Sequence, residues 1–188
     1  MSVFAELFSI RFLFSCIICF GVLMITPAFV SFWIGKKYVM DSLSLLLMTA
    51  ILFVNLSRTT VDAYINAYGL FGDIWAPIVE ASLNVGLSII LGYYFGLHGV
   101  LSGVLISLLL VVFCWKPYYL FRKGLDERLS IYIFMYARHL MAALLCGVIV
   151  CLGMRYSMVQ GDTTFFDGLL GILVFLSLIH ISEPTRPY

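Results

Sequence analysis

Residues 12–34 read FLFSCIICFGVLMITPAFVSFWI, a run without a single Asp, Glu, Lys or Arg. An α-helix needs about 20 mostly apolar residues to cross the hydrocarbon core of a bilayer. A strand of a membrane barrel would instead alternate apolar and polar side chains. Because the run is long and shows no alternation, it predicts a transmembrane α-helix.

The composition of the whole chain agrees with this prediction. Hydrophobic residues make up 63% of the 188 residues and charged residues 11%, whereas a soluble domain carries about 25% charged residues. A soluble fold of this size would leave much of that apolar surface in water. The net charge of +1 and the lack of a basic patch argue against nucleic acid as a partner. The sequence therefore predicts an integral membrane protein.

Further apolar stretches follow the first one along the chain. They cover residues 42–68, 74–95, 100–115 and 131–154, and a partial sixth begins near residue 165. Trp33, Trp75 and Trp115 lie at the predicted helix ends, where the membrane interface favours tryptophan. We therefore expect an all-α, polytopic transmembrane bundle of five spans and a partial sixth. Residues 42–68 and 74–95 should form a tight antiparallel hairpin around Phe71.

The distribution of Lys and Arg predicts the orientation, because cytoplasmic loops collect positive charge. One set of loops carries Arg11, Lys116, Arg122, Lys123 and Arg128, and the other carries Lys36, Lys37 and Arg155. This bias places Met1, the turn at 69–73 and a loop at 116–128 in the cytoplasm. The loop after residue 34, the turn at 96–99 and the loop at 155–164 then face outward.

The end of the chain, from Leu176, reads LSLIHISEPTRPY. This string resembles the translation of a transposon-derived adaptor used in preparing sequencing libraries. We therefore expect residues 1–175 to form the transmembrane region and residues 176–188 to be a non-native tail that packs against little. His180 and Glu183 are accordingly excluded as site candidates.

Little in the sequence favours an enzyme or a metal site. Cys16 and Cys19 form a CxxC pair, but it lies inside an apolar stretch and lacks a second pair. Structural zinc usually takes four Cys or His ligands. No HExxH motif and no nucleophile beside a base is evident. We expect no catalytic residues, metal or cofactor.

Polar residues inside the apolar stretches are the main functional signal. Ionised groups are costly in a bilayer, so they usually face a protein interior or an aqueous cavity. One helical face carries Asn55, Arg58, Asp62 and Asn66, and another carries Glu80, Asn84 and Ser88. In a hairpin around Phe71, Arg58 comes level with Asn84, and Asp62 with Glu80.

We therefore expect Arg58, Asp62, Glu80 and Asn84 to line a cavity, with Arg58 within salt-bridge reach of Asp62, Glu80 or both. The alternative is that the helix leaves the bilayer near Arg58, which then extends to the cytoplasmic interface. Arg138, inside the stretch at 131–154, also has two interpretations. Its guanidinium suits a lipid phosphate or diphosphate, or it simply extends to the head groups.

Three stretches resemble one family of transporters. They are PAFVSFWIGKKYVMDSLSLLL (27–47), INAYGLFGDIWAPIVEASLNVGLSIILGYYFGLHGVLSG (65–103) and WKPYYLFRKG (115–124). Together they are similar to the C-terminal half of Wzx-type flippases for lipid-linked O-antigen and capsule. Those flippases belong to the multidrug/oligosaccharidyl-lipid/polysaccharide exporter superfamily. The resemblance covers about residues 6–154.

The resemblance implies one lobe of a two-lobe transporter in a bacterial cytoplasmic membrane, with the N-terminal lobe missing. The implied cargo is an undecaprenyl-diphosphate-linked oligosaccharide, whose diphosphate would meet cationic residues of the cavity. A cation-coupled drug exporter of the same superfamily is the alternative. An integral membrane polymerase or acyltransferase fits less well, because a polymerase should show a large outer loop and the longest here is about residues 155–164.

Overall fold

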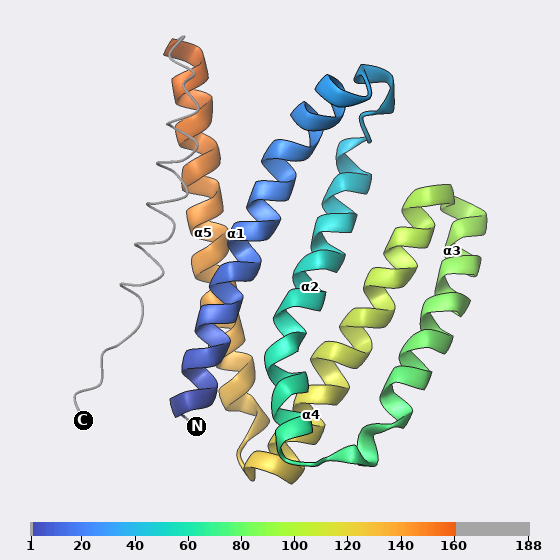
Figure 1. The fold of residues 1–188 in the computed structure, drawn as a ribbon, viewed down its shortest axis with the longest axis vertical. Coiled ribbons are helices and arrows are strands. Elements are labelled where there is room, and N and C mark those ends of the chain that lie inside the picture. Colours follow the sequence, from blue (N-terminus) through green and yellow to red (C-terminus); the bar gives the residue numbers. More distant parts are fainter. Residues whose placement is uncertain (1, 161–188) are drawn as a thin grey trace. The chain divides into compact units, whose positions relative to one another are not determined.

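A computed structural model describes residues 2–160, and every regular element in that part of the chain is helical (Figure 1). The predicted partial sixth span and the predicted tail at 176–188 lie outside the described residues. The chain divides into two compact units after Tyr132. The elements in chain order are α1 (Ser2–Trp33), η1 (Lys36–Tyr38), α2 (Ser42–Ala67), η2 (Phe71–Asp73), α3 (Trp75–Leu108), η3 (Leu109–Trp115), α4 (Lys116–Leu120), η4 (Phe121–Leu125) and α5 (Leu129–Gln160).

Within residues 2–160, three helical stretches are long and apolar enough to cross a membrane: Val3–Trp33, Ser42–Ala67 and Trp75–Leu125. Large apolar side chains on them, such as Phe32 and Ile89, are exposed. A helix that presents this much apolar surface needs an apolar environment around it. The prediction of an all-helical chain with membrane-length helices is therefore confirmed for the described residues.

A stripe of phenylalanines joins α1 to its neighbours. Phe4, Phe8 and Phe12 follow one another at intervals of four residues, which places them on one helical face, and all three are buried. The ring of Phe4 meets the edges of the Tyr64 ring on α2 and the Phe121 ring on η4, at 4.9 Å and 5.6 Å between centroids. Edge-to-face pairs of this kind stabilise packing beyond the area they bury.

Helix α3 reverses direction at Gly96, whose φ of 59° and ψ of −134° are not helical. The reversal produces a first arm, residues 75–95, and a second arm that continues from residue 97 (Figure 1). Gly99 and Gly103 on the second arm face the backbone of the first: a Cβ on Gly99 would lie 1.9 Å from the Leu91 carbonyl oxygen, and one on Gly103 would lie 2.7 Å from the Ser88 amide nitrogen. Small residues four apart let two membrane helices approach this closely.

The packing partner of α2 corrects the predicted hairpin. Residues 42–68 and 74–95 do run antiparallel (Figure 1), but the apolar core cluster that contains Val54 of α2 is completed by Leu108 and Val112. The second arm therefore packs against α2. The first arm packs against the second through the glycines, so it is not the tight apolar partner of α2 that the sequence predicted.

The predicted loop at 116–128 is wrong over most of its length. The second arm continues as helix through η3, α4 and η4 to Leu125, and only residues 126–128 before α5 are not helical. Proline usually ends or kinks a helix, because its ring removes one backbone N–H and crowds the preceding turn. The chain instead widens into π-helical turns at η3 and η4 on either side of the proline, which accommodates it without a break.

Two predicted loops meet at one end of the first unit. Asp41 accepts a hydrogen bond from the Ser44 amide at 3.1 Å and so caps α2. The same carboxylate oxygen lies 2.7 Å from Nε2 of His98, in the turn after Gly96. The loop after α1 and the turn of α3 therefore share an end, as the orientation predicts, although which side of a membrane they face stays a prediction.

Asp41 should continue to cap α2 in mild acid. Hydrogen bonds from His98 and Ser44 hold the pKa of Asp41 well below its usual range. A depressed pKa adds stability that is present above the ordinary aspartate pKa of about 3.9 and is lost as the pH falls through the lower folded value. Hydrogen-exchange protection of the Ser44 amide should therefore persist at about pH 4.

Two variants separate the cap from the ion pair. Asp41→Ala should remove the protection of the Ser44 amide, whereas Asp41→Asn should keep the cap and lose only the charge that faces His98. Equal protection of this amide in the alanine variant and the wild type would contradict the capping role.

Candidate functional site

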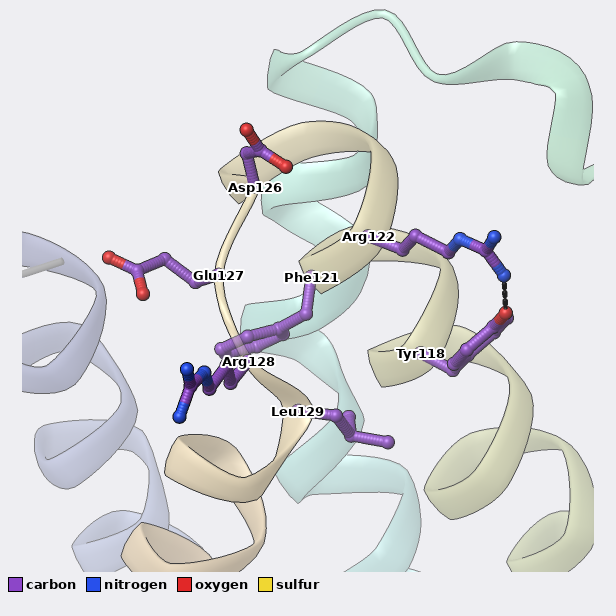
Figure 2. A pocket seen from close by; sticks show the side chains of 7 residues that line it. All are labelled: Tyr118, Phe121, Arg122, Asp126, Glu127, Arg128 and Leu129. Atoms are coloured by element: carbon purple, nitrogen blue, oxygen red, sulfur yellow. Dashed lines mark hydrogen bonds between the residues drawn. The ribbon is translucent and has the colours of Figure 1, made fainter.

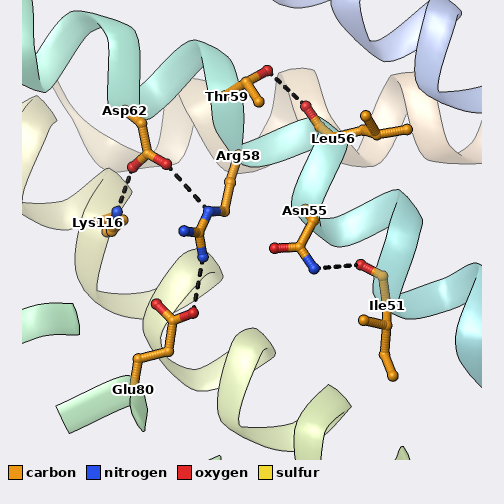
Figure 3. A network of polar contacts seen from close by, with 8 residues as sticks. All are labelled: Ile51, Asn55, Leu56, Arg58, Thr59, Asp62, Glu80 and Lys116. Carbon is orange, nitrogen blue, oxygen red and sulfur yellow. Dashed lines mark hydrogen bonds and ion pairs between the residues drawn. The ribbon is translucent and has the colours of Figure 1, made fainter. Parts of the chain in front are cut away.

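Four charged side chains from α2, α3 and α4 form one ion cluster (Figure 3). Arg58 lies at its centre: its Nε is 3.2 Å from Oδ2 of Asp62, and its Nη1 donates to Oε1 of Glu80 at 2.9 Å. Lys116 donates to the other oxygen of Asp62. The prediction that Arg58 reaches Asp62, Glu80 or both is confirmed, because it reaches both.

The local helices explain this geometry. Arg58 and Asp62 are one helical turn apart on α2, so their side chains lie on the same face. Glu80 comes from the start of the first arm of α3 and Lys116 from the second arm. The cluster therefore ties α2 and both arms of α3 together near the end at which α2 turns into α3.

The cluster is electrically balanced and only partly solvated. Two cations face two carboxylates, and the exposed fractions of the side chains are 27% for Arg58 and Asp62, 16% for Glu80 and 10% for Lys116. Charged hydrogen bonds offset the cost of removing such groups from water only when each charge has a partner. Removing one member therefore leaves an uncompensated charge among apolar helices.

Lys116 was missed as a site residue because it was assigned to a loop. The structure places it within the helix, with 8% of its surface exposed. One signal in the sequence pointed to it: a single arginine leaves the two carboxylates of Asp62 and Glu80 with an excess negative charge. Lys116 is the first lysine or arginine after Glu80 in the chain.

Asn84 lies outside the ion cluster, which corrects the predicted register. It accepts a hydrogen bond from the Ser88 hydroxyl, one turn along the same arm, at 3.3 Å. Arg58 pairs with Glu80, one turn earlier than the level of Asn84. Asn55, which was predicted on the same helical face as Arg58, donates to the Ile51 carbonyl of its own helix at 3.0 Å. The charged residues of these two helical faces, Arg58 and Glu80, thus pair with each other. The neutral residues Asn55 and Asn84 form hydrogen bonds within their own helices.

Arg138 belongs to the second unit and lies exposed on α5. Within the described residues of that unit it forms no ion pair. Cys16 and Cys19 are buried on α1, and the Cys19 thiol contacts the Thr49 carbonyl oxygen at 3.7 Å. Among the described residues, no three His, Cys, Asp or Glu side chains come together as metal ligands.

Lys116 should be coupled energetically to Asp62. We expect Lys116→Gln to destabilise the fold by about 1–3 kcal/mol, between the values for exposed and buried ion pairs. Asp62→Asn should cost a similar amount, and the double variant less than the sum of the two. A double-mutant cycle on detergent-solubilised protein measures this coupling. Simple additivity would show that the two side chains do not interact in solution.

Comparisons with known proteins found no match among family models, curated proteins or solved structures.

Proposed function

We propose that this chain is the C-terminal lobe of a flippase that moves an undecaprenyl-diphosphate-linked oligosaccharide across a bacterial cytoplasmic membrane. The cargo would supply surface polysaccharide such as O-antigen or capsule. The observation that carries the proposal is the ion cluster around Arg58, set among helices of membrane length and partly open at its surface. A neutral apolar channel needs no such cluster, and its charges are costly to keep there.

The chemistry of the cluster suits a diphosphate. A guanidinium presents a planar fork that binds phosphate oxygens through two parallel hydrogen bonds, and a lysine adds a point charge. In the resting state these donors are occupied by Asp62 and Glu80. A diphosphate that reaches the ion cluster would exchange with the carboxylates, so the protein would not have to keep bare cations in the membrane.

In the proposed placement α1, α2, both arms of α3 and α5 each cross the bilayer, which gives the five predicted spans. Residues 68–74 and 126–128 face the cytoplasm, and residues 34–41 and 96–99 face outward. The partners are the lipid-linked oligosaccharide, the surrounding lipids and an N-terminal lobe of the same protein. Asn84 and Arg138 stay candidates for contacts with the cargo outside the ion cluster.

Deleting the gene in its host tests the cargo. A flippase predicts loss of surface polysaccharide and accumulation of undecaprenyl-diphosphate-linked repeat units inside the cell. A drug exporter of the same superfamily predicts intact polysaccharide and greater sensitivity to cationic drugs, and that result would overturn the proposal. Glycosyltransferase genes beside this one would support the flippase.

A further inference from the structure

The two carboxylates of the ion cluster are held in different ways (Figure 3). Asp62 bonds both cations: one of its oxygens lies 3.2 Å from Nε of Arg58, and the other accepts from Lys116. Glu80 makes a single contact, in which its Oε1 accepts from Nη1 of Arg58 at 2.9 Å, and its Oε2 has no partner among residues 2–160. Displacing Glu80 therefore breaks one charged hydrogen bond, whereas displacing Asp62 breaks two.

The guanidinium group of Arg58 has a half-occupied edge. Its terminal nitrogens, Nη1 and Nη2, form an edge that suits two parallel hydrogen bonds to a carboxylate or a phosphate. Glu80 uses only Nη1, and Nη2 has no hydrogen-bond partner within the described part of the chain. Asp62 bonds Nε, away from this edge. A phosphate can thus take both terminal nitrogens once Glu80 alone has left.

Asp62 keeps Arg58 and Lys116 together, because each cation bonds one of its two oxygens. The two arginines of the polar pocket at the end of the second arm provide a contrast (Figure 2). Within residues 2–132, Arg122 and Arg128 share no carboxylate, and their guanidinium groups point to opposite sides. Only the cations of the ion cluster are therefore arranged to meet one anion.

Glu80 also connects the first arm of α3 to α2. Within residues 2–160, its contact with Arg58 is the only hydrogen bond or ion pair that joins these two segments. Glu80 lies five residues after the start of α3 at Trp75, which is about 7.5 Å along a helix. In the proposed placement a freed Glu80 can therefore extend to the cytoplasmic head groups, where its charge is solvated.

We propose that Glu80 is a built-in substitute for a phosphate of the cargo. It occupies the terminal edge of Arg58 until a diphosphate displaces it, while Asp62 stays and positions Arg58 and Lys116. Its departure also releases the first arm from α2, so that arrival of the cargo is coupled to a movement of that arm. The inference rests on the proposed function, because it takes a diphosphate as the ligand, and it assigns the two carboxylates opposite roles.

Titration of the full chain in detergent with farnesyl diphosphate, measured by isothermal titration calorimetry, tests these roles. Glu80→Gln should bind about tenfold more tightly than the wild type, because a charged competitor for Arg58 is gone. Asp62→Asn should bind about tenfold more weakly, because Arg58 and Lys116 are no longer held together. Asp62→Glu, which keeps a carboxylate for both cations, should recover part of that affinity.

The opposite signs distinguish these roles from simple electrostatic attraction. Loss of either carboxylate adds one positive charge, so attraction alone would tighten binding in both variants. Tighter binding by Asp62→Asn, or unchanged or weaker binding by Glu80→Gln, would overturn the inference and leave the proposed function standing, because the wild type still binds a diphosphate. Absence of binding in every variant and in the wild type would overturn both.

Glu127→Gln is the matched control. It makes the same change at an exposed carboxylate of the pocket in Figure 2, which forms no ion pair within residues 2–160, and it should bind like the wild type. Circular dichroism would confirm that each variant is folded. If Glu80→Gln does not fold, Glu80→Asp replaces it: its shorter side chain keeps the charge but reaches Arg58 less well, so binding should again tighten.

Discussion

Replacing Arg58 with alanine is expected to lower export of the lipid-linked glycan while the protein still inserts into the membrane. Arg58 is the only member of the ion cluster that bonds both carboxylates. A hydrogen bond to a charged group contributes about 1.5–3 kcal/mol, so loss of the side chain should lower export roughly tenfold or more. Surface polysaccharide and the amount of protein in the membrane fraction are the two measurements.

Companion variants separate cargo binding from charge balance. Arg58→Lys keeps the charge and loses the planar fork, so it should retain part of the export. Arg58→Ala combined with Glu80→Ala removes one charge of each sign, so the remaining pair of Asp62 and Lys116 is electrically neutral. If the double variant recovers full export, Arg58 serves only to balance charge, and its proposed contact with the diphosphate is wrong. Arg11→Ala, which alters an exposed arginine on α1, is the control.

The second large effect is expected at Gly99. A methyl group there would sit 1.9 Å from the Leu91 carbonyl oxygen, which belongs to the backbone and has no rotamer to change. The arms of α3 must then separate. Overpacking costs about 1–3 kcal/mol and occasionally more, so Gly99→Ala should lower the thermal midpoint in detergent by about 5–10 °C.

Gly86 provides the matched control for this variant. It lies on the first arm of the same helix, and nothing is found within 4 Å of a Cβ built there. Gly86→Ala should leave the midpoint unchanged or raise it, because alanine favours a helix over glycine by about 1 kcal/mol. If both alanine variants unfold at the wild-type temperature, the close contact between the arms does not contribute to stability.

Much of this fold follows from the pattern of apolar residues. The long uncharged runs predict helices, and the spacing of Arg58 and Asp62 predicts a shared face, because both depend only on local geometry. The pairing of Arg58 with Glu80 follows from a short connection between two antiparallel helices. The choice between Glu80 and Asn84 depends on a shift of one turn, which residue counting across a loop does not resolve.

Other features depend on contacts between distant segments. The sequence predicts that α2 packs on the segment next to it in the chain, yet Val54 packs on Leu108 and Val112. Gly99 and Gly103 permit this, because they let the first arm lie against the second at backbone distance. Lys116 was assigned to a loop because the apolar stretch ends at Trp115. The structure continues the helix past this point, with wider turns on both sides of Pro117.

The reversal at Gly96 also bears on how the protein enters a membrane during synthesis. Between Glu80 and Lys116 the only ionisable side chains are two tyrosines, one cysteine and His98. In the proposed placement, the segment that must cross the bilayer is therefore the short turn around Gly96, with no lysine, arginine or carboxylate to carry over. Moving one ionised side chain to the centre of a bilayer costs at least about 2.5–3.5 kcal/mol on the translocon scale. The two arms can thus partition into lipid together as a preassembled pair, already in contact at Gly99 and Gly103, without waiting for the rest of the chain.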